Sequence, residues 1–211
     1  MRIRITFSKT DAMRYTGHLD LHRAWERSFR RAGLPLAYSQ GFHPQPKLNL
    51  ACALPLGFTS ECERIDAWLD AELSPIEIQA ALVEALPPGI CIHSLEEIDR
   101  KAPALQTQVQ SVEYWVTLLD PLSDLDTRLG RIVSAASLPR LRRGKAYDLR
   151  PLIEAIQRLP DGVDGLPRLE MRLAARESAT GRPEEVLAEL GVGIEAARVH
   201  RVQLHYQEKA P

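Results

Sequence analysis

Segments in which polar and apolar residues strictly alternate constrain the fold of this chain more than any other feature. Residues 2–9 show the pattern most clearly, because Ile3, Ile5 and Phe7 fall on one side of an extended backbone and polar residues fall on the other. Such alternation is typical of a strand with one face buried. In the first half of the chain we expect strands at residues 2–9, 48–56, 64–73 and 90–95.

Two helices are predicted between these strands. The first begins near His18 and ends at Gly33 and Pro35, residues of the types that commonly stop helices. The second begins at Ser74-Pro75-Ile76-Glu77, which combines an N-cap serine, a proline at the first helical position and a glutamate at the third. The resulting βαββαβ order predicts a ferredoxin-like α+β domain over residues 1–100, with two helices on one face of an antiparallel sheet.

The second half of the chain repeats this plan over residues 109–208, after a polar linker around Pro103. Residues 151–159 are ambiguous, because their apolar residues have helical spacing although the repeat requires a strand there. We predict a strand that pairs, through a turn at Asp161-Gly162, with the strand that follows Leu166. The predicted fold is two ferredoxin-like halves packed together, and an unrelated α+β second half is the alternative.

The overall charge of the chain does not favour nucleic-acid binding. The 27 Lys and Arg residues and the 28 Asp and Glu residues nearly cancel, so a nucleic-acid surface would have to come from local clustering. The N-terminus lacks the apolar core of a signal peptide, and no run approaches the roughly 18 apolar residues of a membrane span. We therefore expect a cytoplasmic protein without a membrane partner.

The three cysteines, Cys52, Cys62 and Cys91, do not form a recognisable motif. Their odd number and wide spacing argue against disulfides and against an iron–sulfur cluster. No metal and no other cofactor is predicted. A zinc site assembled from Cys and His residues that are remote in sequence is the alternative.

Residues 39–47 form the most constrained stretch of the chain. Gly41 allows a positive φ, and Pro44 and Pro46 fix their own φ, so the polar side chains of this stretch belong to a stiffened loop. Together with the start of the first helix, this loop gives a predicted ligand or anion site. Its residues are Gly17, His18, Asp20, Gln40, Gly41, Phe42, His43 and Lys47.

We expect residues 34–40 to run back along the first helix and to bring His43 near the helix N-terminus, where free N–H groups favour an anion. His18, His43 and Lys47 are then candidates for acid–base catalysis at a phosphate, since His titrates near neutral pH and Lys stabilises negative charge. A purely structural role for the histidines is the alternative. A second alternative is a hairpin that places residues 40–43 at the opposite end of the sheet, far from His18.

Residues 139–147 form a basic loop, which is the sharpest electrostatic feature of the sequence. Arginine matches the geometry of phosphate, and an aromatic ring can stack on an exposed base, so RNA is the expected ligand. An acidic patch on a protein partner and a merely solvated loop are the alternatives. The predicted RNA-binding residues are Arg140, Arg142, Arg143, Lys145, Tyr147 and Arg150.

Several short motifs, in this order, resemble those of the radical-SAM-linked proteins, a bacterial family. The motifs are Gly17-His18-Leu19-Asp20-Leu21, the helix to Arg30-Arg31-Ala32-Gly33, Ser39-Gln40-Gly41-Phe42-His43-Pro44, Ala53-Leu54-Pro55-Leu56-Gly57 and Tyr147-Asp148-Leu149-Arg150-Pro151-Leu152-Ile153. Members of that family are fused to, or encoded beside, radical SAM enzymes that carry a cobalamin-binding region. The resemblance implies such an enzyme as a partner, in cis or in trans.

The three cysteines lack the close spacing that a radical SAM cluster needs, so the resemblance implies a companion to that chemistry rather than the enzyme itself. We expect a non-catalytic substrate-binding or adaptor module that binds RNA, either tRNA or rRNA. The alternative function is a metal-independent endoribonuclease of the paired ferredoxin-like type, an analogy that depends on topology alone.

Overall fold

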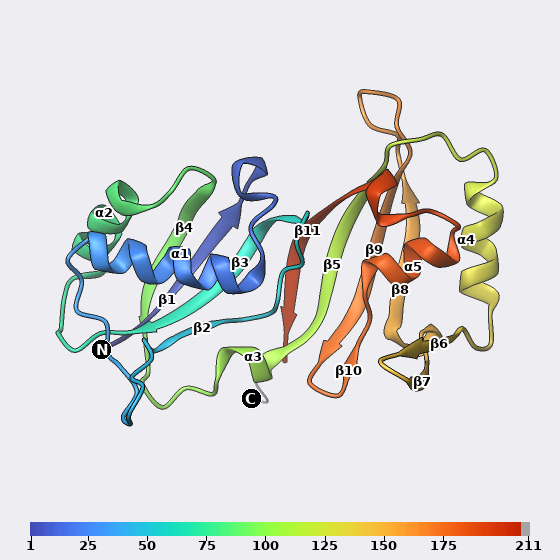
Figure 1. The fold of residues 1–211 in the computed structure, drawn as a ribbon. Helices are drawn as coiled ribbons and strands as arrows, with labels where there is room; N and C mark the ends of the chain where they lie inside the picture. The colour runs from blue at the N-terminus through green and yellow to red at the C-terminus, as the bar shows by residue number, and fades with distance from the viewer. Residues whose placement is uncertain (208–211) are drawn as a thin grey trace. The chain divides into compact units, whose positions relative to one another are not determined.

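The computed structural model describes residues 1–207 and divides the chain into two compact units, Met1–Val109 and Gln110–Pro211. Each unit combines helices with a sheet whose paired strands are antiparallel wherever their registers are defined (Figure 1). The predicted α+β class is therefore confirmed. None of the helices in residues 1–207 is long and apolar enough to span a membrane.

The first unit follows the predicted order of strands and helices. Its strands have the order β4-β1-β3-β2 in the sheet, and each neighbouring pair is antiparallel. The elements are β1 (Arg2–Lys9), α1 (His18–Arg31), β2 (Leu48–Leu50), β3 (Thr59–Trp68), α2 (Pro75–Ala85), β4 (Ile90–Ile98) and α3 (Leu105–Gln108).

The core of the first unit lies between its sheet and the helices α1 and α2, which cover one face of the sheet (Figure 1). Ile3, Ile5 and Phe7 of β1 are fully buried there, as their alternation predicts. Trp25 of α1 contacts Phe7 edge to face, with 4.8 Å between the ring centroids, a favourable geometry for an aromatic pair. Helix α2 begins with the predicted capping box, in which Ser74 and Glu77 bond reciprocally to backbone N–H groups.

Three strands of the first unit differ from their predicted bounds, and one of them, β4, continues to Ile98 instead of ending at 95. β2 contains only Leu48–Leu50 of the expected strand at 48–56, and β3 begins at Thr59 and ends at Trp68 instead of covering 64–73. The partner strand sets these limits, because β3 is paired with β1 from Lys9 opposite Ser60 to Arg2 opposite Trp68. Alternation alone cannot reveal where the partner strand ends.

The polar stretch after β4, which we expected to be a linker, belongs to the first unit. It contains α3, and Leu105 in that helix is fully buried. The carbonyl groups of Ala102 and Pro103 accept hydrogen bonds from the guanidinium of Arg2. The segment therefore packs against β1 instead of crossing solvent.

The second unit contains a sheet with the strand order β8-β9-β5-β11, and β10 also pairs with β9. Its elements are β5 (Val109–Leu118), α4 (Leu125–Ser134), β6 (Pro139–Arg142), β7 (Lys145–Asp148), β8 (Ile153–Leu159), β9 (Arg168–Arg176), β10 (Ala179–Thr180), α5 (Pro183–Glu189) and β11 (Ala197–Tyr206).

The ambiguous stretch at 151–159 is mostly a strand. β8 pairs antiparallel with β9, with Leu159 opposite Arg168. The turn between them is closed by a hydrogen bond from the N–H of Gly162 to the carbonyl oxygen of Leu166 (2.9 Å). The predicted strand pairing is confirmed, and the helical spacing of the apolar residues is not used for a helix there.

The basic segment is not the loop that we predicted but a two-stranded hairpin, β6–β7, inserted between α4 and β8. Arg142 and Lys145 are directly opposite each other, so the turn contains only Arg143 and Gly144. Both turn residues have positive φ, 51° and 77°. This is the geometry of a type I′ turn, whose twist matches that of the flanking strands.

Candidate functional site

Two of the four cations of the β6–β7 hairpin, and Arg150 after it, are neutralised or held by other groups. Arg140 forms an ion pair with Glu189, and Arg142 forms one with Glu185; both carboxylates belong to α5. Arg150 donates its hydrogen bonds to the carbonyl oxygens of Ile153 (3.0 Å) and Val133 (3.1 Å). Three of the predicted RNA-binding residues therefore have structural partners, which sequence reasoning did not anticipate.

Arg142 and Tyr147 form a fixed pair on one side of the hairpin. The Arg142 guanidinium lies over the Tyr147 ring, 4.7 Å from its centroid, and its Nη2 donates to the Tyr147 hydroxyl (3.2 Å). Hydrogen bonding to Glu185 raises the pKa of Arg142, and burial raises the pKa of Tyr147. The guanidinium therefore stays charged and the phenol stays protonated at neutral pH.

The base of the hairpin is closed by Asp148. Its Oδ1 accepts hydrogen bonds from the backbone N–H groups of Leu138 (2.7 Å) and Arg150 (2.9 Å). These two bonds lower the pKa of Asp148, because they favour the charged form of the carboxylate. The N–H of Leu149 also donates to the carbonyl oxygen of Leu138 (2.9 Å), so the two ends of the inserted segment lie side by side.

Arg143 and Lys145 are the two exposed cations of the hairpin without an ion-pair partner among residues 1–207. Together with the pair formed by Arg142 and Tyr147, they line a pocket of about 430 Å³ that also includes β10. The hairpin therefore combines two available positive charges with one rigid, partly aromatic wall. Sequence clustering identified the segment but could not show which of its charges are available.

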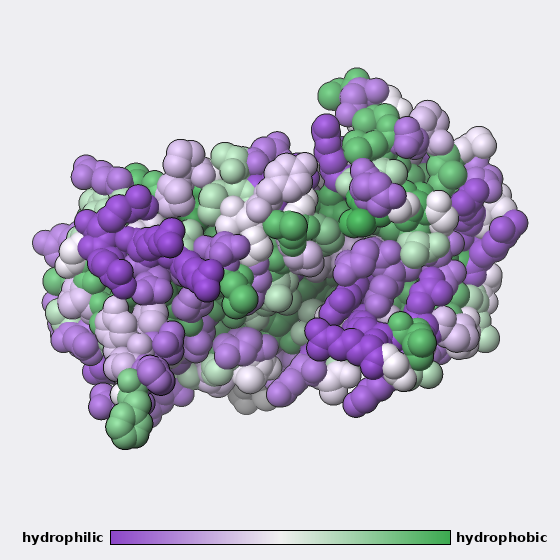
Figure 2. Space-filling model, viewed as in Figure 1, coloured by the Kyte–Doolittle hydropathy of each residue, from purple (hydrophilic) through white to green (hydrophobic). Residues whose placement is uncertain are grey.

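Residues 38–46 form a tight turn in the first unit. Tyr38 and Pro46 make an isolated antiparallel bridge, and Ser39 accepts a hydrogen bond on Oγ from the N–H of Gln45 (2.9 Å). Gly41 has a φ of 135°, a value that L-residues rarely adopt. Phe42 is fully exposed. Figure 2 shows hydrophobic surface on the protrusion at the lower left of the view, where Figure 1 draws the turn after α1.

Part of the predicted ligand site does come together beside this turn. Gln40, Gly41 and Lys47 line one pocket of about 390 Å³. The other lining residues include Trp68 and Asp70 near the end of β3 and Arg100 after β4; the complete set is Ala37, Tyr38, Ser39, Gln40, Gly41, Pro44, Lys47, Trp68, Asp70 and Arg100. Sequence reasoning found Gln40, Gly41 and Lys47. It missed Arg100 and Trp68.

Neither His18 nor His43 lines this pocket, and the predicted convergence of His18 with His43 is wrong because the two lie at different ends of the sheet. The N–H of Ala37 donates to the carbonyl oxygen of Trp68 (2.8 Å), and Trp68 pairs with Arg2 at the start of β1. Helix α1 begins after the other end of β1, seven residues or about 23 Å further along. Figure 1 shows the chain making its turn beyond the C-terminal end of α1, so Gly17, His18 and Asp20 lie at the opposite end of the sheet.

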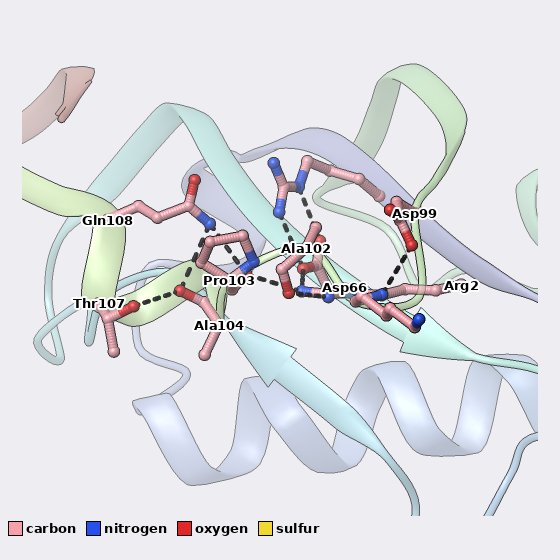
Figure 3. A network of polar contacts seen from close by, with 10 residues as sticks. Arg2, Asp66, Asp99, Ala102, Pro103, Ala104, Thr107 and Gln108 are labelled. Atoms are coloured by element: carbon pink, nitrogen blue, oxygen red, sulfur yellow. Dashed lines mark hydrogen bonds and ion pairs between the residues drawn. The ribbon is translucent and has the colours of Figure 1, made fainter. Parts of the chain in front are cut away.

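A buried charge network lies beside the tryptophan of the pocket, and Figure 3 shows its polar contacts around Arg2 and Asp66. Arg2 is almost fully buried and donates to Asp66 Oδ2 (2.6 Å) and to the carbonyl oxygen of Ala102 (2.6 Å). Arg4 donates to Asp66 Oδ1 (2.8 Å). The Arg2 guanidinium lies over the Trp68 ring, 4.5 Å from its centroid. The alternation of β1 and β3 places these charged residues on the same face of the sheet, which is the signal that could have identified them.

One of two similar solved structures supports the fold of the chain. A chain in "Crystal Structure of a Cbf5-Nop10-Gar1 Complex" is similar with a TM-score of 0.51 and 10% identity, covering 96% of this chain and 48% of the solved one. A chain in "Structure of H/ACA RNP bound to a substrate RNA containing 2'-deoxyuridine" is 10% identical with a TM-score of 0.41, covering 87% of this chain and 43% of that one. This chain thus spans about half the length of each.

The family comparison covers most of the chain. No curated protein matched the sequence. Residues 2–183 match the model of a family described as an uncharacterized protein conserved in bacteria (DUF2344). Because the match extends over far more than half of the 211 residues, the chain belongs to this bacterial family.

Proposed function

We propose that the protein binds RNA in the cytoplasm through the β6–β7 hairpin. The observation that carries this proposal is the pair of exposed cations, Arg143 and Lys145, beside a pocket with a fixed Arg142–Tyr147 wall. Arg143 can hold a phosphate with two parallel hydrogen bonds, and Lys145 acts as a point charge. Fewer residues are therefore available for phosphate than the six that the sequence indicated.

The backbone of Arg143 supports a role for its side chain. A φ of 51° places it in the left-handed region, which glycine and asparagine adopt far more easily than arginine does. A type I′ turn by itself would favour asparagine or glycine at this position. Strain of this kind is common where a side chain has a function, and phosphate binding would be such a function here.

The rest of the proposal is supported by the strand orders and by the family resemblance. The strand orders β4-β1-β3-β2 and β8-β9-β5-β11 support the inference that both units are ferredoxin-like, with the β6–β7 hairpin as an insertion in the second. The resemblance to radical-SAM-linked proteins supports a non-catalytic adaptor that holds tRNA or rRNA for a cobalamin-binding radical SAM enzyme. The endoribonuclease alternative still depends on topology alone, and the acid–base candidates His18 and His43, at opposite ends of a sheet, do not form a pair for it.

The test compares RNA binding by the wild-type protein and by the double variant Arg143→Gln/Lys145→Gln across a range of salt concentrations. If both residues contact phosphates, the variant should bind more weakly, and its log–log salt dependence should be flatter by about 1.4–1.8 units. The matched control is Arg131→Gln/Arg198→Gln, which removes two exposed charges of the same unit outside the hairpin. Equal affinity and slope for the two double variants would overturn the proposal.

A further inference from the structure

The pocket beside residues 38–47 contains features of a second ligand site, in the first unit and independent of the hairpin. We propose that this pocket binds a nucleotide, with the base against Trp68 and the phosphate at Lys47 and Arg100. The pocket volume of about 390 Å³ is within the usual range for small-molecule sites, roughly 300–1,000 Å³. Its lining combines an aromatic ring, two cations and several hydrogen-bonding groups.

Trp68 is held in place as a stacking surface before any ligand arrives. The Arg2 guanidinium lies over the indole ring. Asp66 and two backbone carbonyl groups fix that guanidinium (Figure 3). Trp68 is only partly buried and lines the pocket, so we place the base against the part of the ring that Arg2 leaves uncovered. A base can stack on such a ring whatever its sequence context, because every base has a π-face.

The two cations of the pocket are available for an anion. Lys47 and Arg100 are exposed, and neither has an ion-pair partner among the residues that the structure describes. They come from different parts of the chain, before β2 and after β4, and both line the same pocket. A phosphate bound between them would satisfy both charges.

Asp70 provides a basis for choosing among bases. Asp70 and Trp68 are two residues apart at the end of an extended segment, where alternate side chains lie on the same side about 6.6 Å apart. A carboxylate accepts hydrogen bonds and donates none when it is ionised. Guanine offers two adjacent N–H donors on one edge, so the pocket should prefer guanine nucleotides to uridine nucleotides.

The test is a fluorescence titration with GMP in a Trp115→Phe background. This substitution removes the exposed tryptophan of the second unit, and Trp25 is fully buried, so quenching reports on the partly buried Trp68. We expect saturable quenching by GMP, weaker binding of UMP, and weaker binding of guanosine, which lacks the phosphate. Arg100→Gln should weaken GMP binding about tenfold, and the neighbouring Lys101→Gln, outside the pocket lining, should leave it unchanged.

Two further arms complete the test. A 5′-phosphorylated RNA that begins with guanosine would bind more tightly than GMP if the natural ligand is an RNA end, and no more tightly if it is a free nucleotide. The Arg143→Gln/Lys145→Gln variant should bind GMP normally, so the two proposals fail separately. The nucleotide proposal is overturned if GMP gives no saturable quenching, or if Arg100→Gln and Lys101→Gln have equal effects.

Discussion

Replacing Arg143 by asparagine should make the protein more stable and a poorer RNA binder at the same time. Among residues 1–207, Arg143 is the one non-glycine residue with a positive φ. Its side chain has no ion-pair partner among those residues. The substitution therefore removes backbone strain and one exposed charge, and little else. Most surface substitutions change stability by less than about 0.5 kcal/mol, so a clear gain would be diagnostic.

The size of the gain follows from the φ of 51°. A left-handed conformation costs an ordinary L-residue about 1–2 kcal/mol, and asparagine recovers part of that cost because its short side chain bonds locally. We expect Arg143→Asn to raise the free energy of unfolding by about 0.5–1 kcal/mol. For a unit of about 100 residues this corresponds to a Tm increase of roughly 2–5 °C.

Urea unfolding and thermal unfolding, each followed by circular dichroism, measure the change, and the same protein preparations are then assayed for RNA binding. Lys145→Gln is the matched control, since it removes one hairpin charge without a change in backbone strain. It should weaken RNA binding with little effect on stability. If Arg143→Asn is less stable than wild type, the strain argument is refuted. If it binds RNA as well as wild type, the claim that the strained Arg143 binds phosphate is refuted.

Two further predictions concern buried and hydrogen-bonded carboxylates. Asp66→Ala should lower the free energy of unfolding by about 3–5 kcal/mol in urea denaturation, because it leaves the buried guanidinium of Arg2 without its counter-ion. Asp148→Asn should flatten the acid limb of the stability curve. The pKa of Asp148 is lowered in the folded state, so its contribution is present above the unfolded pKa near 3.9 and is lost as the pH falls through the folded value. Unfolding of both proteins measured from about pH 6 to pH 3 would show equal limbs if Asp148 had no such role.

Much of the secondary structure could be predicted because it depends on local rules. The alternation of Ile3, Ile5 and Phe7 and the capping box at Ser74 act over a few residues, and both appear in the structure. The strand predicted at 151–159 went against the helical spacing of its apolar residues, because the repeat of the strand order required a strand there, and the structure has one at Ile153–Leu159.

The candidate sites depended on pairings that local rules do not contain. We expected residues 34–40 to return along α1, but Leu36 pairs with Leu69 and holds the turn at the far end of the sheet. The chain runs back towards the other end of the sheet only after this turn, from β2 onwards. His43 therefore stays far from His18. The carboxylates that neutralise the hairpin come from α5, about 43 residues further along the sequence, where nothing marks them as partners of arginine.

The way in which the β6–β7 hairpin joins the second unit makes it an exchangeable part. The chain leaves and re-enters the unit at Leu138 and Leu149, which are hydrogen-bonded to each other, so the segment between them can be shortened or replaced without changing the path of the sheet strands. Glu185 and Glu189 on α5 form the ion pairs that hold the hairpin, and they could hold a different basic hairpin in the same way. Relatives of this protein could thus acquire new ligand preferences by swapping about ten residues, and an engineer could graft a chosen recognition hairpin onto the same anchor points.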